Sequence, residues 1–142
     1  MTDAADSIRQ GAVIRVDDID PATGLRGHPG CTAYRMLTPP GGLSRWLHLT
    51  YDDFEPGGGI DPHYHEGLEA DHAYYVVEGD VRARIGDEFF DVGPRSLMVF
   101  PCQEVHGFTV GPEGAVVLRL GAAPDGRASG GSVFVDDEGD RS

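Results

Sequence analysis

Short apolar segments separated by glycine and proline dominate the hydrophobic pattern of this chain. The segments are rich in valine, leucine and aromatic residues, and each has a length that suits a β-strand. No longer window shows the stripe, repeating every ~3.6 residues, of an amphipathic helix. The predicted strands are AVIRV (12–16), TAYRML (32–37), SRWLHLTYDDF (44–54), HAYYVVEG (72–79), VRARIG (81–86), EFFDV (88–92), SLMVFP (96–101), GFTV (107–110), AVVLRL (115–120) and SVFVD (132–136).

Turn residues between these segments indicate how the strands are joined. The chain has 21 glycines and 10 prolines, and two short stretches, EGD (78–80) and GDE (86–88), are typical of hairpin turns. About ten short strands joined in this way indicate an all-β fold, either an antiparallel β-sandwich or a barrel. The chain length suits one domain over residues 1–142, with polar and frayed ends at 1–10 and 136–142.

Charge and composition exclude several classes of partner and one class of catalysis. The net charge of −13 disfavours nucleic-acid backbones and anionic membranes as partners. No apolar run is long enough to span a bilayer, and the start of the chain lacks the basic and apolar regions of a secretory signal, so a cytoplasmic location is expected. All eleven basic residues are arginine. Schiff-base catalysis by a side-chain amine is therefore excluded.

The stretch PHYHEGLEADH (62–72) holds three of the six histidines and is the first candidate for chemistry. Residues two apart in a strand point to the same side, so His63 and His65 are able to share one metal ion. Two histidines on a solvent-facing strand are the plainer alternative. His106, which follows the predicted strand at 96–101, is the candidate for a remote ligand.

These two stretches resemble the two motifs of the cupin superfamily, G-x5-H-x-H-x(3,4)-E-x6-G and G-x5-P-x-G-x2-H-x3-N. His63 and His65 match the centre of the first motif, with Gly79 at its end, and Pro101 and His106 match the core of the second. The resemblance implies a single cupin domain, that is, a jelly-roll barrel of antiparallel strands with a metal between them. It also implies a homodimer.

The fourth ligand of the family is usually the glutamate of the first motif, and here two residues compete for its place. Glu69 has the expected spacing from His65, but the residue expected to be glycine after it is Val76. Counting back from Gly79 instead reaches His72. Because the strand runs without interruption into its predicted turn, we take the turn to fix the register and assign His72 as the ligand. Glu69 remains the rival.

A site of four histidines is similar to that of the small monocupin cyclases of aromatic polyketide biosynthesis, of the resistomycin type. This resemblance implies a divalent metal, zinc first and nickel or iron as alternatives, which assists the regiospecific aldol cyclisation and aromatisation of a poly-β-ketone. Tyr74 shares the strand face of His72 and is a candidate lining residue or general acid. Glu69 is a candidate base near the metal. Solvated or purely packing roles are the alternatives for both residues.

Two other functions fit the same residues. A cupin dioxygenase would use iron, copper or nickel at these histidines, and a non-catalytic cupin would bind a small ligand there.

On the strand before the first motif, Trp46 and His48 share one face and Tyr51 lies on the other, so the three cannot all line one cavity.

Overall fold

The computed structural model describes residues 11–38, 44, 46–66, 71–122 and 131–135. Within these ranges the chain forms one short 3-10 helix, η1 (Val16–Asp18), and eight strands that pair antiparallel throughout. The strands are β1 (Cys31–Leu37), β2 (Leu47–Phe54), β3 (Gly59–Glu66), β4 (Asp71–Ile85), β5 (Glu88–Val92), β6 (Ser96–Pro101), β7 (His106–Ala122) and β8 (Gly131–Phe134). The predicted all-β fold is confirmed, and the predicted frayed ends lie outside the described residues.

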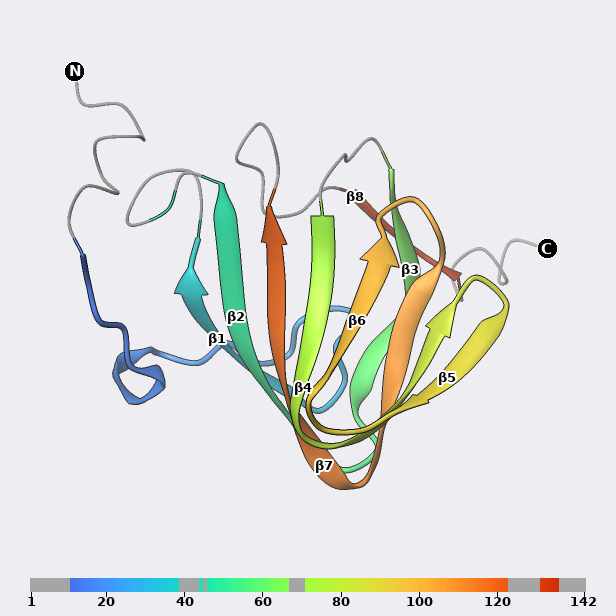
Figure 1. Ribbon diagram of the computed structural model, residues 1–142, viewed down its shortest axis with the longest axis horizontal. Helices are drawn as coiled ribbons and strands as arrows, with labels where there is room; N and C mark the ends of the chain where they lie inside the picture. Colours follow the sequence, from blue (N-terminus) through green and yellow to red (C-terminus); the bar gives the residue numbers. More distant parts are fainter. Residues whose placement is uncertain (1–10, 39–43, 45, 67–70, 123–130, 136–142) are drawn as a thin grey trace.

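Two long strands, β4 and β7, run through both layers of a β-sandwich. The first half of β4 and the second half of β7 form one sheet with the strand order β1-β2-β7-β4-β6. The remaining halves form the facing sheet, with the order β8-β3-β7-β4-β5. Figure 1 shows the two sheets as the arms of a V, joined at the bottom where β4 and β7 bend.

The bend of β4 replaces a hairpin that the sequence predicted. We expected EGD (78–80) to be a turn between two strands, but β4 continues through it, and register shifts lie on either side of Gly79. Gly79 has a φ of +84°, and a Cβ there would collide with the carbonyl oxygen of Gly114 on β7. The glycine therefore permits a bend and a close approach of two strands, not a reversal.

Two other predictions about local structure have opposite outcomes. The turn at GDE is confirmed, because β4 and β5 form a hairpin in which Ile85 faces Glu88. The segment AVIRV (12–16) is not a strand in the structure. None of the helices among the described residues has the length and apolar character needed to cross a membrane.

Inward-facing positions change from polar at the open end of the V to apolar at the bend. Along β4 they run from His72 to the fully buried Val76, and along β2 they run from His48 to Phe54. The starts of β2, β4 and β7 and the end of β3 lie at the open end (Figure 1). Apolar burial near the bend holds the sheets together, and the open end is where polar side chains gather.

Candidate metal centre

Three buried histidines of one sheet gather at the open end of the sandwich. His63 and His65 point inward from β3, and His106 opens β7 directly opposite His63 in the sheet register. One ligand atom from each of the three lies within 4.8 Å of the others. The predicted pair and the remote histidine are therefore positioned to bind a metal ion, as in cupins.

Hydrogen bonds to the ring nitrogens fix the tautomer of two of these histidines. Nδ1 of His63 lies 2.8 Å from the carbonyl oxygen of Asp61, and Nδ1 of His106 lies 2.7 Å from that of Glu104. A carbonyl only accepts, so each Nδ1 carries the proton and donates it. Each Nε2 then presents a lone pair, which is the form that binds a metal.

His72 approaches this group from the facing sheet. Its ring centroid lies 5.2 Å from that of His65, and its side chain is 5% exposed. Both ring nitrogens of His72 are buried without a hydrogen-bond partner among the described residues, as is Nε2 of His106. Unpaired buried nitrogens are costly, and a metal ion between the two sheets would satisfy Nε2 of His106 and one ring nitrogen of His72. The donor set thus fits a divalent metal, while Glu69 lies outside the described residues.

Burial keeps these imidazoles in the neutral form that a metal requires. It lowers the pKa of His106 to about 4, although the hydrogen bond to Glu104 opposes the shift. It also lowers the pKa of His72 to about 4, with further lowering by the neighbouring His48 and His106. The pKa of His63 shifts in the same direction for the same reason. At neutral pH a metal therefore has no additional proton to displace from His63, His72 or His106.

Tyr74 lies one inward position beyond His72 on β4 and lines the same cavity. It is 3% exposed, and its ring packs against Phe100 and Phe108 at centroid distances of 5.1 and 5.7 Å. Burial raises the pKa of the Tyr74 hydroxyl to about 12. The hydroxyl therefore keeps its proton at neutral pH and is able to donate it to a substrate oxygen.

A cavity of about 440 Å³ opens beside the histidines. His48 lines it from β2, with its ring 5.5 Å from that of His72, and His28 lines it from the loop before β1. All six histidines of the chain therefore contribute to the cavity or to the metal centre behind it. Trp46 is 48% exposed and, unlike His48, does not line the cavity, although the sequence placed these two residues on one face; Tyr51 does not line it either, so the three do not all face it.

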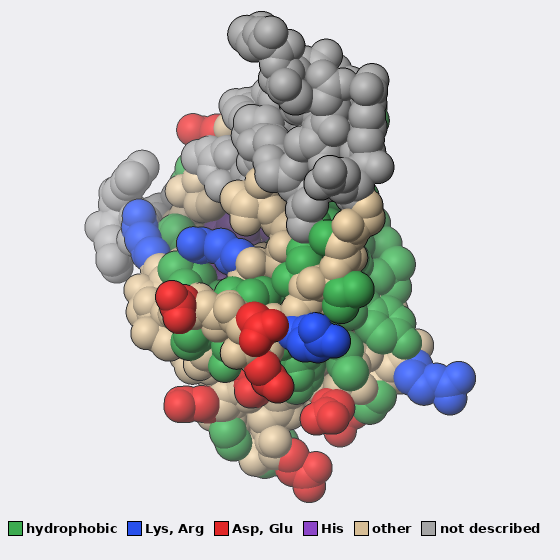
Figure 2. Space-filling view, turned by 90° about the vertical axis from the view of Figure 1, so that its left-hand side faces the viewer, with side chains coloured by type: hydrophobic (Ala, Val, Ile, Leu, Met, Phe, Trp, Pro, Cys, Tyr) green, Lys and Arg blue, Asp and Glu red, His purple; other side chains and the backbone are tan. Residues whose placement is uncertain are grey.

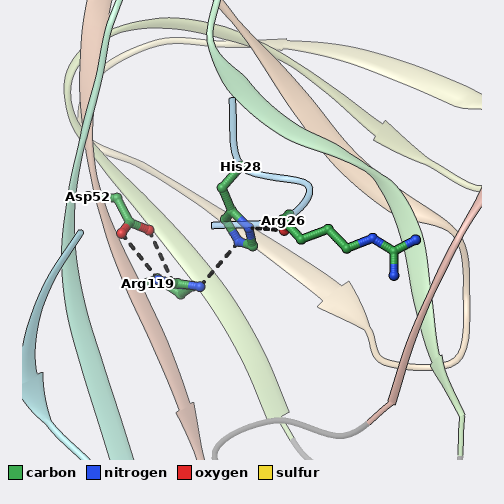
Figure 3. A network of polar contacts seen from close by, with 4 residues as sticks. All are labelled: Arg26, His28, Asp52 and Arg119. Carbon is green, nitrogen blue, oxygen red and sulfur yellow. Dashed lines mark hydrogen bonds and ion pairs between the residues drawn. The ribbon is translucent and has the colours of Figure 1, made fainter. Parts of the chain in front are cut away.

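A buried network of polar side chains forms another wall of the cavity (Figure 3). Arg119 contacts the carboxylate of Asp52 through Nε at 3.1 Å and Nη2 at 3.2 Å, and its Nη1 lies 3.3 Å from Nε2 of His28. Nδ1 of His28 donates to the carbonyl oxygen of Arg26 at 2.9 Å. Burial lowers the pKa of His28 to about 4, so its neutral Nε2 accepts from the guanidinium.

Sequence reasoning missed this network, although two signals pointed to it. Asp52 falls on the inward face of β2, the face of His48 and Phe54, where a carboxylate needs a partner. Arg119 interrupts the apolar run AVVLRL, where a buried guanidinium has the same need. The pairing of β2 with β7 joins the two, since Thr50, two residues before Asp52, lies opposite Arg119.

Comparison with known proteins assigns the chain to a family. Residues 50–120 match the family model described as the cupin domain. Two solved structures resemble the chain in fold. The polyketide cyclase RemF from Streptomyces resistomycificus has a TM-score of 0.72 and 24% identity over 89% of this chain and 86% of its own. KdgF from Halomonas sp. has a TM-score of 0.67 and 22% identity over 80% and 94%.

One curated relative matches a shorter part of the chain. A gentisate 1,2-dioxygenase from Haloferax sp. is 33% identical over 58 residues. The match covers 41% of this chain and 15% of the dioxygenase. The chain therefore matches only a small part of the length of that relative.

Proposed function

The chain belongs to the cupin family, and from this premise we propose that it is a metal-dependent cyclase acting on a poly-β-ketone. In this proposal it catalyses a regiospecific intramolecular aldol cyclisation followed by aromatisation, in the cytoplasm. The observation that supports the proposal is that His72, buried and with unpaired ring nitrogens, lies beside the three-histidine group, its ring centroid 5.2 Å from that of His65. We take His72 as the fourth donor, in place of the glutamate of the motif that the sequence resembles.

A neutral donor set suits Lewis-acid chemistry. His63, His65, His72 and His106 would hold the ion, with zinc the first expectation and nickel or iron the alternatives. Four imidazoles leave the charge of a divalent ion uncompensated, whereas a carboxylate would cancel part of it. When bound, such an ion polarises a carbonyl oxygen of the substrate.

The chain's own residues supply the proton transfers of the aldol step. A methylene between two carbonyls loses a proton, its carbon forms a bond to a distant carbonyl carbon, and that carbonyl oxygen takes up a proton. Tyr74, protonated and inside the cavity, is the proposed donor to this oxygen. Glu69 is the proposed base. Loss of water then gives the aromatic ring, so the cyclisation and aromatisation consume no oxidant.

The cavity provides the positioning that an open-chain substrate needs. Its walls come from β1, β2, β3, β4, β7 and β8, so the substrate is enclosed between the two sheets. A flexible poly-β-ketone has several competing ring closures, and a shaped cavity favours one carbon pair over the others. The absence of lysine from the chain leaves no side-chain amine for a Schiff-base route.

The test is turnover by zinc-loaded protein under argon, followed by mass spectrometry. The expected product is lighter than the poly-β-ketone by whole water molecules and is a single regioisomer. His72→Ala protein should give only the mixture that forms spontaneously. An oxygen requirement, or a product heavier by two oxygen atoms, would refute the cyclase proposal, because zinc has no redox step.

A cupin dioxygenase is the second candidate, and the sequence match to gentisate 1,2-dioxygenase favours it. It would use iron, copper or nickel at the same histidines. Metal analysis of protein from its native host and oxygen uptake during turnover separate the two enzymes. A non-catalytic cupin that binds a small ligand would show no turnover with either metal class.

We also propose that the protein is a homodimer. Large apolar side chains remain exposed on the outer face of β6, namely Leu97 (54%) and Val99 (61%). A second copy covering this face would bury them. Sedimentation of wild type and Val99→Glu tests this: a dimer that becomes a monomer supports it, and a wild-type monomer contradicts it.

A further inference from the structure

The cavity beside the metal centre is lined by basic side chains in a chain that is acidic overall. Three arginines line the cavity, Arg26, Arg35 and Arg119, whereas no aspartate or glutamate is among its described lining residues. The whole chain has 24 acidic residues against 11 basic ones. Figure 2 shows basic side chains beside a hollow in which histidine is visible, with most acidic side chains in the lower part of that face.

Asp52 holds Arg119 in place without cancelling the charge of the wall. The carboxylate forms an ion pair with the guanidinium, its Oδ2 3.1 Å from Nε, and accepts one N–H of Nη2, while Nε2 of His28 accepts one N–H of Nη1. A guanidinium has five N–H groups, so N–H groups remain for a ligand in the cavity that Arg119 lines. The side chain is 18% exposed and is held from two sides, which preorganises it for binding.

Arg35 lines the cavity from β1, close enough for its charge to act on Asp52 together with that of Arg119. Burial raises the pKa of Asp52 to about 6, and the charges of Arg119 and Arg35 act against that rise. Arg26 lies over the ring of Phe134, with its guanidinium carbon 4.7 Å from the ring centroid. Among the described residues that line the cavity, these arginines therefore meet no carboxylate, and Asp52 lies behind Arg119. A divalent metal at the histidines would increase the excess of positive charge.

We propose that Arg119 and Arg35, supported by Arg26, form a carboxylate-binding subsite that orients an anionic substrate in the cavity. A planar guanidinium matches a carboxylate through paired hydrogen bonds, and clefts of one charge attract ligands of the other. The inference rests on the proposed function, since the carboxylate would be the acid end of the poly-β-ketone. The substrate is then a free poly-β-keto acid, not a thioester joined through that carboxyl group to a carrier.

Calorimetry with a matched pair of aromatic probes tests the subsite without turnover. Zinc-loaded, full-length protein is titrated with 2,4-dihydroxy-6-methylbenzoate and with its neutral methyl ester. The acid should bind at least about tenfold more tightly than the ester, as expected for charge-assisted hydrogen bonds. Arg35→Gln and Arg119→Gln should each remove most of this preference by weakening the binding of the acid. The affinity for the ester and the zinc content should stay unchanged.

Two further variants keep the test decisive. Arg82→Gln removes an exposed arginine that stacks on Phe89 away from the cavity, and it should leave both affinities unchanged. If Arg119→Gln fails to fold because Asp52 loses its partner, the double variant Asp52→Asn with Arg119→Gln should fold and still lack the preference. Equal binding of acid and ester by wild type, or a preference that survives in folded Arg119 and Arg35 variants, overturns the subsite.

The result is separable from the fate of the cyclase proposal. A preference for the acid that depends on the arginines, in a protein that cyclises no poly-β-ketone, leaves the subsite standing and removes the cyclase. Cyclisation that proceeds equally well on a neutral ester has the opposite meaning: the cyclase stands and the subsite falls.

Discussion

His72 is the proposed fourth ligand of the metal centre, beside the three grouped histidines. His72→Ala should lower zinc affinity by more than about a hundredfold, because a missing ligand costs more than a missing hydrogen-bond partner of a ligand. Competition with a zinc-binding dye measures the change. His48→Ala is the matched control, since His48 contacts the His72 ring from β2 and should leave the affinity nearly unchanged. Loss of metal in Glu69→Ala with retention in His72→Ala would reverse the assignment.

Tyr74 is the proposed proton donor, and removal of its hydroxyl group tests that role. Tyr74→Phe removes the hydroxyl but keeps the ring contacts with Phe100 and Phe108. We expect kcat to fall by about a hundredfold or more, the usual contribution of a positioned general acid. Zinc content and the melting temperature should stay nearly constant. Tyr75→Phe, on the other face of β4, is the control, and an equal loss of kcat in both variants would contradict a role in proton transfer.

Residue-scale prediction succeeded where the chemistry follows strand geometry. His63 and His65 were predicted to share a face because alternation in a strand is local, and His106 followed from motif spacing. Arg119 and His28 could not be found in this way. Their positions depend on which strands and loops meet across the sandwich, and no local pattern specifies those meetings.

At the scale of elements, the bend of β4 and β7 decides the shape of the cavity. Gly79→Ala should lower the free energy of unfolding by about 2–4 kcal/mol, because its positive φ disfavours a side chain and the new Cβ would meet the β7 backbone. Gly57→Ala is the control. Gly57 also has a positive φ, of +78°, but a Cβ there meets nothing within 4 Å, so only the conformational part of the loss should appear. Urea denaturation that gives equal losses would contradict the close approach.

The same bend explains why two pairs of predicted strands are single strands in the structure, HAYYVVEG with VRARIG in β4 and GFTV with AVVLRL in β7. A glycine with positive φ, flanked by acidic residues, suits a hairpin turn and a strand bend equally well. Only the pairing with β7 distinguishes the bend from a hairpin turn, since Gly79 faces Ala115 while β4 continues. Hairpins confined to neighbouring segments, such as β4 with β5, are local and were predicted correctly.

At the scale of the whole molecule, buried neutral histidines make stability depend on pH. Burial lowers the pKa of His28, His72 and His106 to about 4, against about 6.5 in an unfolded chain. The unfolded state therefore binds more protons between these values, so stability present above pH ~6.5 is lost as the pH falls towards ~4. Asp52, with its pKa raised to about 6, acts in the opposite direction as one group against three.

The metal-free protein should therefore melt at a progressively lower temperature as the pH falls from about 6.5 to about 4. Differential scanning calorimetry of chelator-treated protein measures this. His28→Gln removes one of the three groups and should make the fall shallower. A melting temperature that rises on acidification would mean that Asp52, and not the histidines, dominates the balance.

Anomalous diffraction from crystals of zinc-loaded protein tests the proposed four-histidine centre. We predict one anomalous peak at the zinc edge, between the two sheets, bonded to the imidazoles of His63, His65, His72 and His106. A peak bonded to Glu69 with His72 turned away, or no peak among these histidines, would contradict the claim.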